Sequence, residues 1–370
     1  MQKIIEIKGQ INILDDCFKH MKNEKILLVC GNSIEKLQIN NYFNSLETRL
    51  GVKVVKFKDF SPNPSYESVI DGVRIFIENK CKMIVAVGGG SAIDVAKCIK
   101  LFSNLDHNRN YLKQELIPNS VQLLAMPTTA GSGSESTKFA VIYYKGEKQS
   151  VSDESCIPST VILDEFSLNT LPEYQKKSTM LDALCHAMES YWSVNSTEES
   201  RLYSKEAIGL ILANYNGYLM NTNEGNIGMM KAANIAGKAI NISQTTAGHA
   251  MCYKLTSLFG ISHGHAAALC VSKLFPYMVN NMDKCIDSRG EEFLGNIFND
   301  IAKIYGCKSP IFAAKKFDEI ISSLKLDVPK YDSNVFKLLV SSVNSERLKN
   351  NPIELDNNAI EKLYYSILMK

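Results

Sequence analysis

The chain has 370 residues, of which 45% are hydrophobic, and its 41 Lys and Arg nearly balance its 39 Asp and Glu. A formal net charge of +2 without a dense basic block argues against a nucleic-acid-binding protein. No apolar run reaches the roughly 20 residues that span a bilayer, and residues 1–10 lack the apolar region of a signal peptide. We therefore expect a soluble, cytoplasmic protein with no nucleic-acid or membrane partner.

The N-terminal half alternates apolar strands with helical patterns. Expected strands are Lys25–Cys30, Val52–Phe57, Met83–Val87, Leu123–Ala125 and Thr160–Leu163, and Tyr66–Lys80 has the apolar spacing of a helix. Continuous apolar strands separated by helices predict a parallel sheet that is covered on both faces. This pattern predicts an α/β fold for the first part of the chain.

The pattern changes after Pro172, where strand-like runs nearly vanish. Helical periodicity dominates Lys176–Tyr191, Glu198–Tyr215, Gly228–Ile242, Ala247–Leu258 and His263–Asn280. We therefore predict an α/β domain over residues 1–173 and an all-α domain over residues 174–370, with a ligand site at their junction.

The ten cysteines are scattered singly, and no two are spaced as Cys-x-x-Cys. A thiolate zinc site is therefore disfavoured. Isolated cysteines in apolar segments are more typical of small buried side chains in a reducing compartment.

Two turns at the ends of expected strands have the composition of ligand loops. Gly88-Gly89-Gly90 separates a strand from a helix, so backbone can approach a ligand and the helix N-terminus can attract a diphosphate. The spacing is not Gly-x-Gly-x-x-Gly, and a tight connection without a ligand is the alternative. The second turn, Pro127 to Glu135, is rich in hydroxyl groups that suit a ribose or nicotinamide edge, or an ordinary loop. Two such turns at the carboxyl ends of parallel strands support each other, because open α/β sheets bind ligands there.

Four of the six histidines fall in the helical part of the chain. Asp182 and His186 are spaced i and i+4, so they share one helix face. His249 and His263 follow, and one carboxylate with three imidazoles suits a divalent metal. The alternative for Asp182 and His186 is an ordinary polar pair on a helix.

Together these motifs carry a family resemblance. GGGSAIDVAK, PTTAGSGSE, DALCHAMESY and the His-Gly pair at 263–264 resemble, in order, the motifs of the iron-dependent (group III) alcohol dehydrogenases, over roughly residues 25 to 280. The resemblance implies the dehydroquinate synthase-like fold, with a dinucleotide-binding domain, a helical domain, and Fe²⁺ or sometimes Zn²⁺ in the cleft between them.

The resemblance also assigns residues. The implied metal ligands are Asp182, His186, His249 and His263. The implied contacts to NADH or NADPH are Asn63, Gly88, Gly89, Gly90, Ser91, Ala92, Asp94, Thr128, Thr129, Ser132 and Lys148.

The sequence departs from the family pattern at three places. Gly31 stands where many members carry an acid that binds the adenosine ribose, and without that carboxylate NADPH becomes admissible. Tyr253 stands where members often have a proton-shuttling His; Tyr253, water or His265 is the expected proton donor, and His265 could instead only support a ligand. The stretch before His249 is also altered.

That altered stretch is more similar to the phosphonoacetaldehyde reductase branch. An anionic substrate needs a cation, and Lys238 and Arg201 are the candidates, with solvated surface cations as the alternative. We therefore expect reduction of a small aldehyde to its alcohol, phosphonoacetaldehyde to 2-hydroxyethylphosphonate being one case, by a chain that forms a homodimer. The alternatives are a general short-chain alcohol dehydrogenase, a glycerol-1-phosphate dehydrogenase or dehydroquinate synthase-like enzyme, and a non-catalytic metal- or nucleotide-binding protein.

Overall fold

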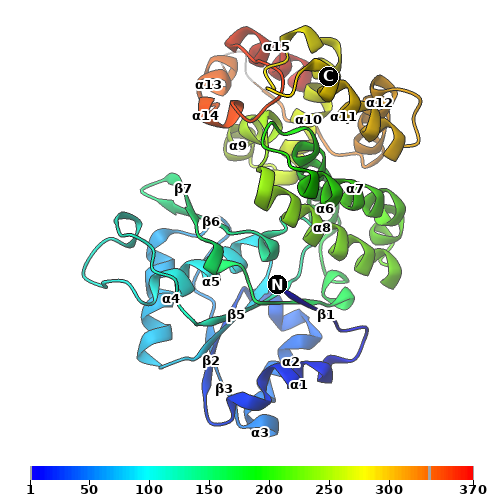
Figure 1. The fold of residues 1–370 in the computed structure, drawn as a ribbon. Coiled ribbons are helices and arrows are strands. Elements are labelled where there is room, and N and C mark those ends of the chain that lie inside the picture. The colour runs from blue at the N-terminus through cyan, green and yellow to red at the C-terminus, as the bar shows by residue number, and fades with distance from the viewer. Residues whose placement is uncertain (1, 332–334, 370) are drawn as a thin grey trace. The chain divides into compact units, whose positions relative to one another are not determined.

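A computed structural model of the chain describes residues 2–331 and 335–369. The chain forms two compact units (Figure 1). The first unit consists of Met1–Leu171 with Asn221–Met230, and the second of Pro172–Met220 with Lys231–Lys370. The inclusion of Asn221–Met230 in the first unit is a feature that the sequence analysis did not anticipate.

The first unit is built on a six-stranded sheet in which all paired strands are parallel. Its order is β1 (Lys3–Glu6), β8 (Thr160–Leu163), β5 (Gln122–Pro127), β4 (Met83–Gly88), β2 (Lys25–Cys30) and β3 (Lys53–Phe57). The expected parallel sheet is therefore confirmed, and β1 adds an edge strand from the N-terminal stretch.

Helices cover both faces of this sheet. They are α1 (Asp15–Phe18), α2 (Gln38–Asn44), α3 (Leu46–Leu50), α4 (Tyr66–Glu78) and α5 (Gly90–Phe102). Successive side chains of a strand point to opposite faces. Accordingly Leu27 and Val29 of β2 join one core with residues of α4 and α5, whereas Ile26 and Leu28 join another with residues of α1 and α2. Burial on both faces explains why these strands are apolar throughout.

An antiparallel hairpin in the first unit was not predicted. Strands β6 (Phe139–Tyr144) and β7 (Glu147–Ser152) pair with Tyr143 opposite Lys148. Lys145 and Gly146 connect them, and both have positive φ, as the tight hairpin turn that matches strand twist requires.

The second unit is helical. Its helices are α6 (Glu173–Trp192), α7 (Glu198–Leu219), α9 (Ala247–Phe259), α10 (His263–Asn280), α11 (Glu291–Ile304), α12 (Pro310–Ser323), α13 (Val335–Ser341), α14 (Ser345–Leu348) and α15 (Asn357–Leu368). Helix α8 (Asn223–Ser243) begins in the first unit and continues into the second. The helical patterns of the sequence are thus confirmed.

Local signals explain where some helices begin. At α7 the Thr197 hydroxyl accepts from the Ser200 backbone N–H, and the Ser200 hydroxyl accepts from the Thr197 N–H, which forms a capping box. All ten cysteines are free, seven of them buried. Within the described residues, no helix combines the length and the apolar character needed to cross a membrane.

Candidate metal centre and cofactor turns

The four predicted metal ligands come from three helices of the second unit, and the three imidazoles converge on one oxygen of Asp182. Asp182 and His186 lie on α6, His249 lies in the first turn of α9, and His263 is the first residue of α10. The Asp182 Oδ1 atom is 3.9 Å from His186 Nε2, 3.6 Å from His249 Nε2 and 4.0 Å from His263 Nε2. Donors held by one tetrahedral ion at about 2.1 Å would be about 3.4 Å apart. Ligand atoms of Asp182, His249 and His263 all lie within 4.8 Å of one another and fit around such an ion, and His186 joins this group through its 3.9 Å approach to Asp182.

Two of these atoms are buried without a protein partner. Asp182 Oδ1 and His249 Nε2 have no hydrogen-bond partner among the described residues, and their 3.6 Å separation is too long for a hydrogen bond. A buried polar atom without a partner is costly. A cation between them would satisfy both, so the donor set fits the expected metal.

Gly264 allows α10 to approach α6 closely enough to form this cluster. A Cβ atom at Gly264 would overlap the Ser178 carbonyl oxygen and would lie 2.6 Å from the Asp182 Cβ. Only glycine avoids this overlap. The His-Gly pair therefore combines a predicted ligand with the residue that lets it lie beside Asp182.

Glu189 is a component of the site that the sequence analysis missed. Its side chain is fully buried on α6, and its Oε2 atom pairs with Nδ1 of His249. Its Oε1 atom accepts the Thr246 N–H at 3.1 Å, the Thr246 hydroxyl at 2.7 Å and the His249 N–H at 3.2 Å. With Nδ1 engaged, Nε2 of His249 is the nitrogen left for a metal. The sequence signal that could have identified Glu189 was its position seven residues after Asp182, on the same face of the same helix.

Charge and burial act in opposite directions in this cluster. Burial lowers the pKa of His249, but the carboxylate of Glu189, followed by Asp182, raises it to about 9. Burial likewise disfavours ionisation of Asp182, yet the imidazoles of His186, His249 and His263 bring its pKa below the ordinary value. The cluster therefore holds a carboxylate that attracts a cation.

The two predicted cofactor turns of the first unit begin side by side. Gly88 of β4 is in register with Pro127 of β5, and the Thr128 N–H donates to the Gly88 carbonyl at 3.0 Å. A Cβ atom at Gly90 would lie 2.9 Å from the Ser132 hydroxyl, so the two turns are in close contact. Helix α5 begins at Gly90, so Ser91 and Ala92 lie in its first turn, and a Cβ atom at Gly89 would lie 3.3 Å from Thr129.

The Asp94 carboxylate accepts hydrogen bonds from other residues of the first unit. Its Oδ1 atom accepts from the Ser134 hydroxyl, and its Oδ2 atom accepts the Val141 N–H at 3.0 Å. Burial raises the pKa of Asp94, and the ammonium groups of Lys97 and Lys148 oppose this effect. The hairpin thus brings Lys148 near Asp94.

Asn63 lies next to the same hairpin. It is exposed, with a positive φ of 58°, between Pro62 and Pro64. The Tyr143 N–H, opposite Lys148 in the hairpin, donates to the Pro64 carbonyl at 2.8 Å. The structure therefore brings the Asn63 loop and the Lys148 strand together.

The two candidate proton donors have different surroundings. The Tyr253 ring stacks on His263 with centroids 5.4 Å apart and planes at 22°, and burial raises the Tyr253 pKa. The Nδ1 atom of His265 lies 3.2 Å from the Tyr174 hydroxyl. Burial lowers the pKa of His265, which favours the neutral imidazole.

Lys238 and Arg201, the two side chains predicted to bind an anionic substrate, differ in their contacts. Lys238 of α8 is half-buried and has no hydrogen-bond or ion-pair partner within residues 2–331 and 335–369. Arg201 donates to the Ser196 carbonyl at 3.3 Å, and its guanidinium lies 5.3 Å from the centre of the Phe293 ring. Arg201 is thus engaged in holding the start of α7.

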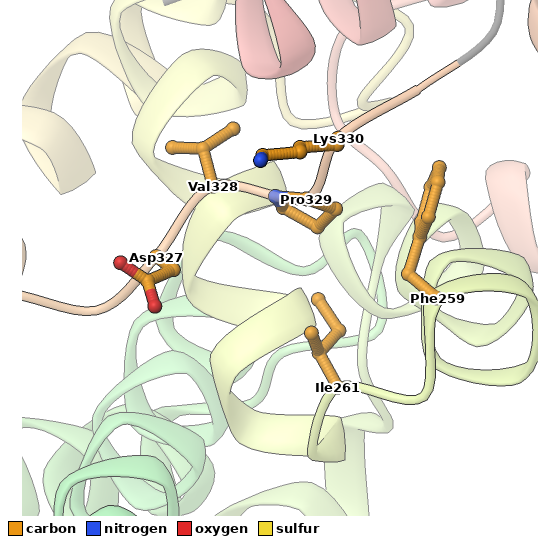
Figure 2. A pocket seen from close by; sticks show the side chains of 6 residues that line it. All are labelled: Phe259, Ile261, Asp327, Val328, Pro329 and Lys330. Atoms are coloured by element: carbon orange, nitrogen blue, oxygen red, sulfur yellow. The ribbon is translucent and has the colours of Figure 1, made fainter.

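A separate open cavity of about 480 Å³ lies beside the turn between α9 and α10. Figure 2 shows its lining side chains, Phe259, Ile261, Asp327, Val328, Pro329 and Lys330. None of these is a predicted metal ligand. The cavity is therefore distinct from the metal cluster, although it adjoins the segment that leads to His263.

Sequence comparison identifies the family to which this fold and site belong. The sequence model described as "Iron-containing alcohol dehydrogenase" matches residues 2–165, and the model described as "Fe-containing alcohol dehydrogenase family, C-terminal" matches residues 176–368. The chain belongs to the iron-containing alcohol dehydrogenase family.

Several characterised proteins are similar to this chain. Aldehyde-alcohol dehydrogenase 2 of Entamoeba histolytica is 32% identical over 69% of this chain, which spans only 31% of that protein. Phosphonoacetaldehyde reductase of Streptomyces viridochromogenes is 28% identical over 77% of this chain and 75% of its own length. NADPH-dependent butanol dehydrogenase of Clostridium saccharobutylicum is 29% identical over 70% of this chain and 68% of its own length.

Solved structures confirm the fold. An iron-containing alcohol dehydrogenase from Thermococcus thioreducens superposes with a TM-score of 0.89 at 20% identity, covering 100% of this chain and 98% of its own. Sulfoacetaldehyde reductase from Bifidobacterium kashiwanohense, solved with NAD⁺, superposes with a TM-score of 0.87 at 24% identity, covering 99% and 97% of the two chains.

Proposed function

We propose that the chain is a metal-dependent, NAD(P)H-linked reductase of small aldehydes. The observation that carries the proposal is the convergence of three imidazole Nε2 atoms on one buried carboxylate oxygen, at 3.6 to 4.0 Å. Family membership agrees with it, because the relatives include alcohol and aldehyde dehydrogenases.

Asp182, His186, His249 and His263 would hold the metal, Fe²⁺ or Zn²⁺. When bound, such an ion supplies a Lewis acid for a carbonyl oxygen. The negative charge of Asp182 favours cation binding, and Glu189 keeps His249 in the tautomer whose Nε2 faces the site.

The glycine turn and the hydroxyl-rich turn would bind the dinucleotide. Free backbone N–H groups at the start of α5 suit a diphosphate, with Gly88 to Ala92 and Asp94 lining that part. Thr128, Thr129 and Ser132 would line the nicotinamide half, and Asn63 and Lys148 would add contacts from the neighbouring loop and hairpin. The cofactor would supply the hydride, so these residues only bind and orient it.

The reaction also needs a proton for the product alcohol. Tyr253 is the stronger candidate, because its ring stacks on His263. His265, whose Nδ1 is near the Tyr174 hydroxyl, is the second candidate. Water is the third.

We infer that NADPH serves at least as well as NADH. At the end of β2 the chain reads Cys30-Gly31-Asn32, with no carboxylate for a ribose hydroxyl. Burial raises the pKa of the Cys30 thiol, and the nearby ammonium groups of Lys58 and Lys56 partly oppose this effect. Lys58 is paired with Glu35 at 2.6 Å, so Lys56, which donates to the side chains of Asn40 and Asn44, is the cation at this edge that would favour a 2′-phosphate.

The proposed substrate class is a short aldehyde that carries an anionic group, with phosphonoacetaldehyde as the first case. The similarity to phosphonoacetaldehyde reductase supports this class, and the half-buried Lys238 is one cation that could attract the anion. We further propose that the chain acts in the cytoplasm as a homodimer; ten free thiols are compatible with a reducing compartment.

The test is oxidation of NADPH and NADH by the metal-reconstituted protein with an aldehyde panel that includes propionaldehyde and phosphonoacetaldehyde. We expect turnover only after metal is added. Activity on a cyclic or polyol phosphate, without any on aldehydes, would instead favour a dehydroquinate synthase-like or glycerol-1-phosphate dehydrogenase reaction. Binding of metal and dinucleotide without turnover of any of these substrates would indicate a non-catalytic protein.

A further inference from the structure

A chain of aromatic contacts connects an arginine to the metal cluster. Arg347, on α14, donates from Nη1 to the Tyr253 hydroxyl at 2.8 Å, and its guanidinium carbon lies 5.0 Å from the centre of the Tyr253 ring. The same ring stacks on His263. Arg347 is therefore separated from a predicted metal ligand by a single side chain.

This guanidinium lacks a compensating acid. Arg347 is half-buried, and no carboxylate of the described part of the chain forms an ion pair with it. Other cations of the second unit differ in this respect, since Lys349 pairs with Glu346 at 2.8 Å and Arg289 pairs with Asp287 at 2.7 Å. A partly desolvated cation whose polar contact is a neutral phenol retains its attraction for an anion.

We propose that Arg347 binds the anionic group of the aldehyde substrate. The inference rests on the proposed aldehyde reduction and names the residue that selects the substrate. With Nη1 on the Tyr253 hydroxyl, the Nε and Nη2 edge of the guanidinium remains to grip an oxyanion with two parallel hydrogen bonds. A phosphonate fits this edge best among short acids, because it offers three oxygens and up to two negative charges.

The other candidate cations have weaker claims to this role. Arg201 is held by Ser196 and the Phe293 ring. Lys238 has no ion-pair partner, yet among the described residues it contacts none of the four predicted metal ligands by any hydrogen bond or ion pair. Tyr253 gives Arg347 a defined position relative to His263, and a carbonyl at the metal with an anion at Arg347 would orient the substrate at both ends.

The test compares Arg347→Met and Arg347→Lys with the unmodified, metal-loaded protein. Lys349→Met is the matched control, because it removes one positive charge two residues away at an exposed site. We measure kcat/KM for phosphonoacetaldehyde, succinic semialdehyde and propionaldehyde, and the dissociation constant of unreactive ethylphosphonate by calorimetry. Thermal unfolding and metal content are recorded for every variant.

We expect Arg347→Met to lower kcat/KM for phosphonoacetaldehyde roughly 10- to 150-fold, the size of one charge-assisted contact. Binding of ethylphosphonate should weaken by a similar factor and kcat/KM for succinic semialdehyde should fall less. Propionaldehyde should lose least, because the only contact that its reduction loses is the hydrogen bond from Arg347 to the Tyr253 hydroxyl. Arg347→Lys should recover part of the loss because it keeps the charge but not the planar fork. Lys349→Met should match the unmodified protein.

Three results would overturn the assignment. Equal losses on propionaldehyde and phosphonoacetaldehyde would mean that Arg347 only joins α14 to Tyr253. Unchanged ethylphosphonate binding in Arg347→Lys and Arg347→Met, with a large loss in Lys238→Met, would assign the anion to Lys238. Reduction of propionaldehyde by the unmodified protein without any preference for anionic aldehydes would remove the inference and leave the proposed reductase intact. If Arg347→Met does not fold, the Arg347→Lys measurements decide.

Discussion

The cofactor turns and the metal cluster are built in different ways. The turns of the first unit depend on main chain at two adjacent strand ends, where Gly88 and Pro127 are in register. The cluster of the second unit depends on side chains from α6, α9 and α10. A short stretch of sequence can therefore describe a turn, whereas the metal cluster exists only when three helices pack in one arrangement.

This difference predicts unequal tolerance to substitution. Main-chain N–H groups survive most side-chain changes near them, provided that no Cβ obstructs the turn. A ligand set loses a coordinating atom with each substitution. The predictions below begin with the ligands, continue to the residues that support them, and end with a side chain at the edge of the cofactor turns.

The largest effect is expected from the ligands themselves. His249→Ala or His263→Ala should abolish activity and lower bound metal, because each removes one of four donors. Metal analysis of the purified variants checks this, with the exposed His20→Ala as control. Full metal occupancy in both variants would show that the ligands lie elsewhere.

Gly264→Ala tests whether close helix packing creates the cluster. The added methyl group would overlap the Ser178 carbonyl oxygen, so α10 must shift away from α6. We expect a loss of about 1–3 kcal/mol in the free energy of unfolding, together with weaker metal binding. The control is Gly209→Ala in α7, where a Cβ meets nothing within 4 Å; there alanine should stabilise the helix by about 0.5–1 kcal/mol. Similar behaviour of the two variants would argue against the packing explanation.

Glu189→Gln should weaken metal binding about 10- to 100-fold while leaving all four ligands in place. Both carboxylate oxygens accept hydrogen bonds, so the amide NH₂ of glutamine must face a donor on either side. Competition with a chelator measures the metal affinity, and unfolding of the metal-free variant separates this effect from general destabilisation. If the metal affinity of Glu189→Gln is unchanged, Glu189 does not support metal binding and its role is structural.

The smallest effect is expected at the cofactor. The unmodified protein should use NADPH at least as well as NADH, and Gly31→Asp should shift the ratio of kcat/KM toward NADH, because a carboxylate repels a 2′-phosphate. A Cβ atom at Gly31 would make only an ordinary contact of 3.8 Å with the Ser33 hydroxyl, so the substitution introduces no clash at that atom. A strong NADH preference of the unmodified protein, on the order of 100-fold, would show that another residue reads the ribose.

Local chemistry in the sequence predicted much of this protein. Apolar runs predicted β2, β3, β4, β5 and β8, because strands buried on both faces are apolar throughout. Helical periodicity predicted α6 to α10. The i, i+4 spacing of Asp182 and His186 placed both on one face of α6. Family motifs then proposed the remaining ligands and the cofactor turns.

Tertiary structure decided the rest, because long-range packing leaves no local pattern. The hairpin of β6 and β7, which brings Lys148 near Asp94, was not visible as a periodic signal. Glu189 became recognisable only when α9 placed the Nδ1 of His249 against it. Arg347 lies far along the chain from every predicted ligand, and its contact with Tyr253 depends on how α14 packs on α9. The sequence by itself therefore determined most of the elements and the types of the predicted ligands. Folding decided which carboxylate supports a predicted ligand and which arginine contacts Tyr253.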